Sequence, residues 1–175
     1  MIALKTPILE TERLILRPLS ENDAEDVFAW TGDTEVNEYM IYLPHKSVSF
    51  TREWLSKMDN DNDKSYTFGY LCKETNHLIG SGGIYYHLDT ADWHIGYNLR
   101  KDAWHKGYAT EAMKRIIAFA HQELGAVAFA SEHAVENIAS GKVLEKCGFR
   151  FCGDGTFTKA DGSRVFPSKQ YSMRL

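Results

Sequence analysis

The stretch NLRKDAWHKGYATEA (Asn98–Ala112) joins the end of an alternating strand to the start of an Ala-rich helix through a short loop. The first turn of a helix has unpaired amides and about half a positive charge. Gly107, which has no Cβ, lets the backbone approach a ligand closely. Arg100, Lys101 and Lys106 add positive potential. We therefore predict an anion-binding loop here, most plausibly for a pyrophosphate.

This loop matches neither standard phosphate-binding motif. The pattern GxxxxGK[ST] is absent because Lys106 precedes Gly107 instead of following it, and GxGxxG is absent too. The Gly-rich segment GSGG (Gly80–Gly83) interrupts strand-like sequence and opens no helix. A dinucleotide-binding Rossmann fold is therefore not expected.

The composition is that of an ordinary globular chain, and its length predicts a single domain spanning residues 1–175. It has 175 residues, 43% of them hydrophobic and 25% charged, and a net charge of −4. This acidic balance argues against a nucleic-acid partner. The sequence shows no signal-like start and no apolar run long enough to span a bilayer, so we expect a cytoplasmic protein without a membrane partner. The spacing of its three cysteines and seven histidines predicts no disulfide framework and no metal site.

The first two thirds of the chain read as strand and helix, then three strands. Arg13–Leu19 alternates as a strand ended by Pro18, Ser20 caps a helix that Gly32 stops, and Val48–Met58 has helical spacing. Three strands follow, with the second bent or bulged at its glycines: Tyr66–Cys72, Leu78–Tyr86 and Asp92–Leu99. We expect these three to form an antiparallel meander.

The last third predicts a β-α-β unit and a hairpin. Ala109–Leu124 is a helix, Ala126–His133 a short strand, and Asn137–Gly148 a helix capped by Asn137. The tail reads as two strands joined at Asp161-Gly162. The fold class is therefore α+β, with a mixed, mainly antiparallel sheet and flanking helices.

Four stretches together resemble one enzyme family. WHKGYATEA is similar to the acyl-CoA signature [RQ]-x-x-G-x-[GA] of the GCN5-related N-acetyltransferases (GNAT), matching it at Gly107-Tyr108-Ala109. Trp104 replaces the leading Arg or Gln, as is typical of the Rim-type branch, the ribosomal-protein N-terminal acetyltransferases. The other matching stretches, in the family's order, are TERLILRPLSENDAEDVF, IGYNL and ENIASGKVLEKCGF. The resemblance covers nearly the whole chain.

The resemblance implies the GNAT fold, whose fourth and fifth strands splay apart around the pantetheine arm of acetyl-CoA, the cosubstrate. The strand Asp92–Leu99 would bind that arm through its backbone. Ser140, one turn after Asn137, would lie near the sulfur. The residues expected to bind the cosubstrate are Asn98, Leu99, His105, Lys106, Gly107, Tyr108, Ala109, Thr110 and Asn137.

The implied reaction is direct attack of a primary amine on acetyl-CoA in a ternary complex. A backbone N–H near Asn98 or Leu99 would stabilise the oxyanion, and Ser140 would protonate the thiolate. Many relatives have Glu where this chain has His94, which could serve as the base with an ordinary pKa of about 6.5. Glu132 and Asp92 are other candidates for the base.

Several alternatives stay open at this point. His94 could be an ordinary strand histidine, Ser140 a helix surface residue and Asn137 only a cap. The protein could bind acyl-CoA as a non-catalytic sensor, or bind nucleotides through the same loop. If it is an enzyme, the acceptor is a protein N-terminus or a small-molecule amine. A homodimer would follow family habit.

Overall fold

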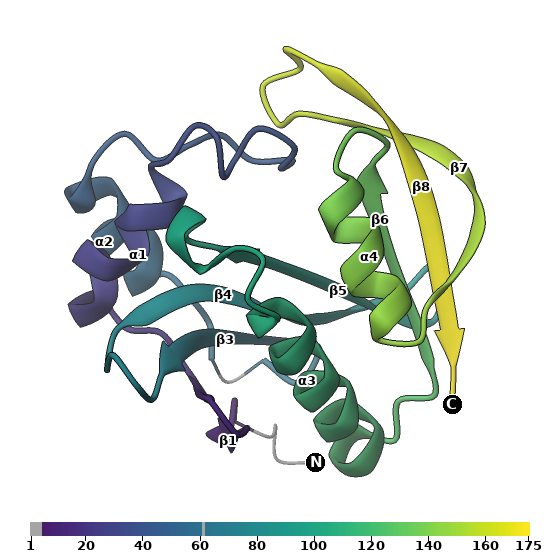
Figure 1. The fold of residues 1–175 in the computed structure, drawn as a ribbon, viewed down its shortest axis with the longest axis horizontal. Coiled ribbons are helices and arrows are strands. Elements are labelled where there is room, and N and C mark those ends of the chain that lie inside the picture. The colour runs from purple at the N-terminus through teal and green to yellow at the C-terminus, as the bar shows by residue number, and fades with distance from the viewer. Residues whose placement is uncertain (1–4, 61) are drawn as a thin grey trace.

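The computed structural model describes residues 5–60 and 62–175, and these form one mixed sheet flanked by helices (Figure 1). The strand order is β1-β2-β3-β4-β5-β6-β8-β7. The strands are β1 (Leu9–Glu10), β2 (Leu14–Arg17), β3 (Ser65–Cys72), β4 (Leu78–His87), β5 (Asp92–Leu99), β6 (Ala128–Ala134), β7 (Arg150–Thr158) and β8 (Val165–Arg174). All neighbouring strands are antiparallel except β5 and β6. The predicted α+β class is confirmed.

The α-helices lie where the sequence predicts them, with small differences at their ends, and the 3-10 turn at Lys101–Ala103 was not expected. They are η1 (Glu21–Asp23), α1 (Ala24–Thr31), α2 (Val48–Ser56), η2 (Lys101–Ala103), α3 (Tyr108–Leu124) and α4 (Ile138–Lys146). Ser20 precedes a 3-10 turn instead of the α-helix itself, and its N–H donates to the Asp23 carboxylate at 2.8 Å. The short strand β1 was not expected from the sequence.

The predicted meander β3-β4-β5 is confirmed, but the expected bulge lies elsewhere. The pairing of β3 with β4 shifts by one residue after Tyr70, and this leaves Ile79 of β4 without a paired residue. The glycines at positions 80, 82 and 83 all pair regularly. The strand is therefore bulged, but at Ile79, one residue before the glycines where the bulge was expected. These glycines are small for another reason, because Cβ atoms at Gly82 and Gly83 would collide with Tyr70 and with the Tyr66 carbonyl.

The β5-α3-β6 crossover produces the splay that the family resemblance implies. The parallel pairing of β5 with β6 is limited to Trp93 with Phe129 and His94 with Ala130. Beyond these pairs the two strands diverge, and the half with β6, β8 and α4 inclines away from the half with β3, β4 and α1 (Figure 1).

Helix α3 is held against the sheet by a continuous apolar face. Its buried residues follow helical spacing, and Phe119 makes edge contacts with Tyr66 and Phe68 of β3. Glycines in the left-handed region bound the helix at both ends, Gly107 with φ 79° and Gly125 with φ 68°. This packing fixes where the N-terminus of α3 points. A second core around Trp30 joins α1 and α2 to the sheet.

The C-terminal strands form the predicted hairpin. β7 and β8 are antiparallel, and Gly162 at the connection has φ 73°. The same hairpin reaches over the loop between α1 and α2, where Lys159 Nζ donates to the carbonyls of Asn37, Glu38 and Met40 at 2.9–3.2 Å. The hairpin thereby fixes a loop that contributes to the site described next.

Candidate active site

Two cavities of about 500 Å³ each meet at β5. The helix-side cavity is lined by the loop after β5, the first turn of α3 and α4. The sheet-face cavity is lined by the opposite face of β3, β4 and β5, by β6 and by the loop around residues 39–45. The residues that line both are Tyr39, Met40, Tyr97, Asn98, Asn137 and Ser140.

The loop before α3 has the strained geometry expected of an anion-binding loop. His105 has φ 60°, unusual for a residue with a side chain, and Gly107 follows at φ 79°. The first helical bond runs from the Glu111 N–H to the Gly107 carbonyl at 3.1 Å. The amides before Glu111 therefore have no intrahelical acceptor and are available to a ligand at the helix N-terminus.

An ionic clamp holds this loop from the residue that precedes β2. Arg13 Nη1 donates to the Lys106 carbonyl at 2.9 Å, Arg13 Nε donates to Glu111 Oε2 at 2.7 Å, and the guanidinium lies 4.3 Å from the centre of the Tyr108 ring. Burial alone would raise the pKa of Glu111, but hydrogen bonds from Thr11 and Arg13 outweigh it and lower the pKa. Sequence reasoning missed this clamp.

Trp104, the departure from the family signature, fastens the loop to the end of β5. Its Nε1 donates to the Leu99 carbonyl at 3.0 Å. The Arg100 N–H donates to Ile79 on β4 at 2.8 Å. Because alternate residues of an antiparallel strand point their N–H groups to opposite edges, the Leu99 N–H points to the β6 side. Of the two backbone donors proposed for the oxyanion, Leu99 thus faces the gap.

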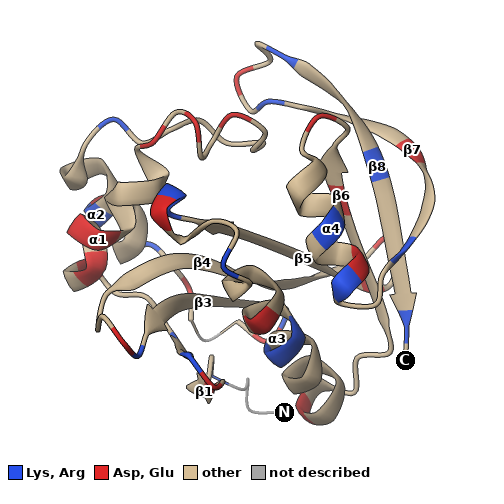
Figure 2. Ribbon diagram, viewed as in Figure 1, with Lys and Arg blue, Asp and Glu red and all other residues tan. Residues whose placement is uncertain are grey.

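The helix-side cavity brings together nearly all the residues predicted to bind the cosubstrate. Eight of the nine line it: Asn98, Leu99, His105, Gly107, Tyr108, Ala109, Thr110 and Asn137. Lys106 does not line it, and its carbonyl is taken by Arg13. The lysines that line it are Lys142 and Lys146, both on α4 (Figure 2). The sequence reasoning had not assigned these two lysines.

Ser140 lies on the wall between the two cavities. Asn137 caps α4, and its Oδ1 accepts from the Ser140 N–H at 3.4 Å, so the capping role is present. Burial raises the pKa of Tyr97 to about 12, and a side-chain hydrogen bond with Ser140 acts in the opposite direction. Two neutral hydroxyl groups therefore face each other where the cavities meet.

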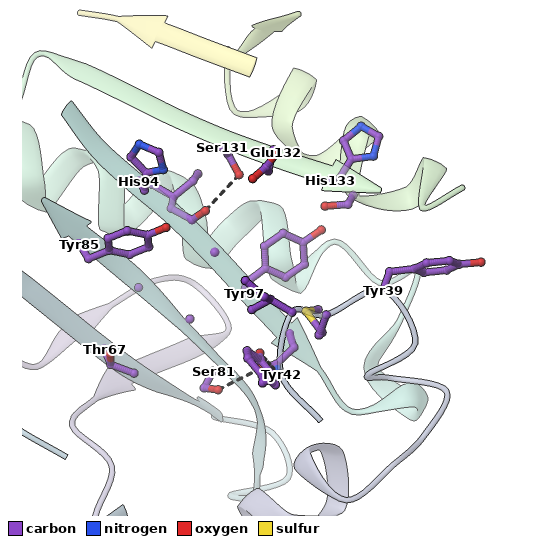
Figure 3. A pocket seen from close by; sticks show the side chains of 18 of the residues that line it. Tyr39, Tyr42, Thr67, Ser81, Tyr85, His94, Tyr97, Ser131, Glu132 and His133 are labelled. Carbon is purple, nitrogen blue, oxygen red and sulfur yellow. Dashed lines mark hydrogen bonds between the residues drawn. The ribbon is translucent and has the colours of Figure 1, made fainter. Parts of the chain in front are cut away.

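In the sheet-face cavity, a polar chain crosses the floor below Tyr97 (Figure 3). Asn98 Nδ2 donates to the Tyr42 hydroxyl at 2.9 Å, and Ser81 Oγ donates to Asn98 Oδ1 at 3.1 Å. Burial raises the pKa of Tyr42 to about 12, so its phenol stays neutral. The Asn98 side chain thus faces this cavity, while its strand also lines the other one.

His94 lies at one end of the sheet-face cavity, beside Tyr85, Ser131 and Glu132 (Figure 3). Its Nε2 is 3.0 Å from Asp92 Oδ1, but the two are not aligned for a hydrogen bond, and this nitrogen has no hydrogen-bond partner among the described residues. Glu132 accepts from Ser168 Oγ at 2.9 Å. All three candidate bases therefore lie near one end of one cavity.

Cys147, which lies just after α4, is disfavoured as a nucleophile. Burial raises the pKa of Cys147 to about 11, which disfavours the reactive thiolate.

Across the described residues no cluster of three or more potential metal ligands is found. No helix within 5–60 and 62–175 is long and apolar enough to cross a membrane.

Comparisons with known proteins agree with this geometry. The family profile described as "Acetyltransferase (GNAT) domain" matches residues 13–150. The uncharacterised N-acetyltransferase p20 of Bacillus licheniformis is 32% identical over 146 residues, 81% of this chain and 82% of that protein. A GNAT acetyltransferase from Bacillus anthracis has a TM-score of 0.84 at 24% identity, covering 96% of this chain and 98% of that one. Spermidine N-acetyltransferase from Vibrio cholerae, solved with CoA and spermine, has a TM-score of 0.79 at 19% identity, covering 94% and 96%.

The splayed sheet and the helix-side loop are those of an acetyltransferase, and the chain belongs to the GNAT family. It is an N-acetyltransferase, as its curated relatives are named. The fold and family that the sequence predicted are thereby confirmed.

Proposed function

We propose that the protein transfers an acetyl group from acetyl-CoA to a primary amine by direct attack in a ternary complex. One observation carries this proposal. Two cavities of similar volume, of which only the helix-side one is lined by lysines and by the first turn of α3, share a wall formed by Tyr97, Asn98 and Ser140. Both substrates can therefore be bound at once, with their reacting atoms at that wall.

The helix-side cavity fits the cosubstrate. The free amides from His105 to Thr110 would hold the pyrophosphate, with Lys142 and Lys146 adding positive charge. The free edge of β5 beyond His94 would bind the pantetheine arm through backbone groups. The Vibrio cholerae relative, which has the same fold, was solved with CoA bound.

In the reaction, the amine nitrogen attacks the thioester carbonyl carbon, the C–S bond breaks, and one proton passes from the amine to solvent through a base. The Leu99 N–H would stabilise the negative charge on the carbonyl oxygen. Ser140, on the same wall as Tyr97, would give a proton to the departing thiolate and regain one from solvent. His94 or Glu132 would accept the amine proton.

Finer assignments rest on the sequence motifs. IGYNL and ENIASGKVLEKCGF are typical of the Rim-type branch, whose acceptors include protein N-termini. We accordingly propose a cytoplasmic, single-domain enzyme of this branch, and a homodimer in keeping with family habit.

The test measures CoA release from acetyl-CoA with a chromogenic thiol reagent, with amines, amino acids, polyamines and peptides as acceptors. Turnover with any amine is the expected result, after a blank for the three cysteines. The alternative, a non-catalytic acyl-CoA sensor, predicts a rise in melting temperature with acetyl-CoA but no turnover. If acetyl-CoA gives no turnover and also no thermal shift, both the enzyme and the sensor hypotheses are refuted.

A further inference from the structure

The floor of the sheet-face cavity has an unusual pattern of side-chain sizes. The register of β3, β4 and β5 puts three cross-strand rows on one face, because paired residues point the same way. The outer rows are Ser65-Tyr85-His94 and Gly69-Ser81-Asn98, and the middle row is Thr67-Gly83-Gly96. On β4 and β5 the middle row is therefore a trough of two glycines between larger residues, whereas Thr67 of β3 closes its third side.

Neither of the two facing glycines has a side chain, and the floor is open above Gly96. A Cβ at Gly96 would meet nothing within 4 Å, so the space above this residue is empty. Gly83 has no room for a Cβ, because the Tyr66 carbonyl fills that position. Neighbouring strands lie about 4.8 Å apart, so the glycine pair exposes a bare peptide surface about as wide as an aromatic ring.

Aromatic rings border the trough on two sides. Tyr85 and His94 stand at one end with ring centres 5.3 Å apart, and Tyr42 stands at the other (Figure 3). Trp54 closes the outer part, with its ring centre 5.3 Å from that of His45. Such a border favours a flat apolar or aromatic group on the floor.

The charge of this cavity is set by one side chain. Ala130 pairs with His94, so Glu132, two residues further along β6, points to the same face across the splay. Glu132 is the one carboxylate among the described lining residues, and these include neither Lys nor Arg. The middle of β4 and β5 carries no charge at all (Figure 2). The cavity therefore offers a carboxylate to a cation and neither a lysine nor an arginine to an anion.

We propose that the acceptor is a primary arylalkylamine without a carboxylate or phosphate group. Its ring lies on the Gly83–Gly96 floor and its ammonium points to Glu132 before deprotonation. This inference rests on the proposed function and narrows its acceptor. The spermine of the Vibrio cholerae enzyme has several ammonium groups, whereas this cavity provides a single carboxylate.

Matched pairs of acceptors test the proposal. We expect kcat/KM for 2-phenylethylamine to exceed that for L-phenylalanine, which adds only a carboxylate, by at least about 100-fold. It should also exceed kcat/KM for spermine and for a short peptide with a free N-terminus. Equal or better turnover with phenylalanine, spermine or the peptide overturns the proposal while leaving acetyl transfer intact. The absence of turnover with every amine refutes the proposed function and, with it, this inference.

Two variants test the glycine floor and the charge of Glu132 separately. Gly96→Val should raise KM for 2-phenylethylamine at least about tenfold and leave KM for acetyl-CoA unchanged. Gly153→Val is the matched control, because Gly153 is also a strand glycine, on β7, whose nearest atom to a new Cβ is 4.0 Å away. Glu132→Gln should reduce the preference for 2-phenylethylamine over phenylalanine at least about tenfold. An unchanged preference would contradict the assignment of Glu132.

Discussion

The two cavities have similar volumes but are built in opposite ways. The helix-side cavity is held by ions and strained backbone, namely the Arg13–Glu111 clamp, His105 and Gly107. The sheet-face cavity is held by neutral groups, namely the hydrogen-bonded chain from Ser81 through Asn98 to Tyr42 and the bordering rings. An anion is bound by oriented hydrogen-bond donors, whereas the ring of a flat amine is bound by a surface of matching shape. Changes to each cavity should therefore affect one substrate and spare the other.

The largest expected effect comes from Gly107→Val. A β-branched residue at φ 79° is strained and would displace the loop amides. We expect KM for acetyl-CoA to rise at least about 100-fold, and the thermal shift with CoA to disappear. The control is Gly125→Val, which imposes similar strain at φ 68° on the other end of α3. If both variants lose CoA binding equally, the loop has no special role.

The next largest effect should come from Ser140→Ala, at the wall between the cavities. Loss of the proton donor should lower kcat roughly 10- to 100-fold with little change in either KM. Steady-state kinetics with both substrates varied would measure this. An unchanged kcat would remove Ser140 from the mechanism. An equal rise in the KM for acetyl-CoA would make it a binding residue instead.

Lowering the pH should weaken the Arg13–Glu111 clamp that holds the helix-side cavity. The pKa of Glu111 is lowered in the folded protein, so its contribution to stability is present above about pH 4.5, its ordinary value, and is lost as pH falls through the lower folded value. The melting-temperature difference between wild type and Glu111→Gln should therefore shrink as pH falls from 6 to 3. A difference that stays constant with pH would show that the clamp is not ionic.

The smallest expected effect is that of Tyr42→Phe. It removes the hydroxyl that accepts from Asn98 Nδ2, one partly buried hydrogen bond worth about 1 kcal/mol. We expect a melting temperature lower by about 2–4 °C and a few-fold higher KM for the amine, with KM for acetyl-CoA unchanged. Tyr86→Phe, outside the lining of both cavities, is the control. A larger rise in KM for acetyl-CoA than for the amine would contradict the placement of the amine in the sheet-face cavity.

Local sequence signals predicted much of the fold. The alternation in Asp92–Leu99 gave the bounds of β5, and the apolar spacing and glycines gave α3 within one residue of its start. The two-residue strand β1 has no period to detect. The family motifs gave the helix-side residues, because the loop and helix that carry them are contiguous in sequence.

What the sequence could not predict depends on contacts between distant segments. Arg13 and Lys106 are 93 positions apart, and only the closed sheet brings them together. Gly83 was expected to mark a bend or bulge, and only the register of β4 with β5 shows that it faces Gly96. The role of Trp104 was likewise hidden, since its indole turns back to Leu99.

The wall shared by Asn98 and Ser140 has a consequence for inhibitor chemistry. CoA joined through its sulfur to an arylalkylamine by an acetyl bridge would fill both cavities with one molecule. Once one half is bound, the tether holds the other at an effective concentration in the millimolar range or above. The joined compound should therefore bind more tightly than either half, and single changes in either cavity, such as Gly107→Val or Gly96→Val, should each weaken it.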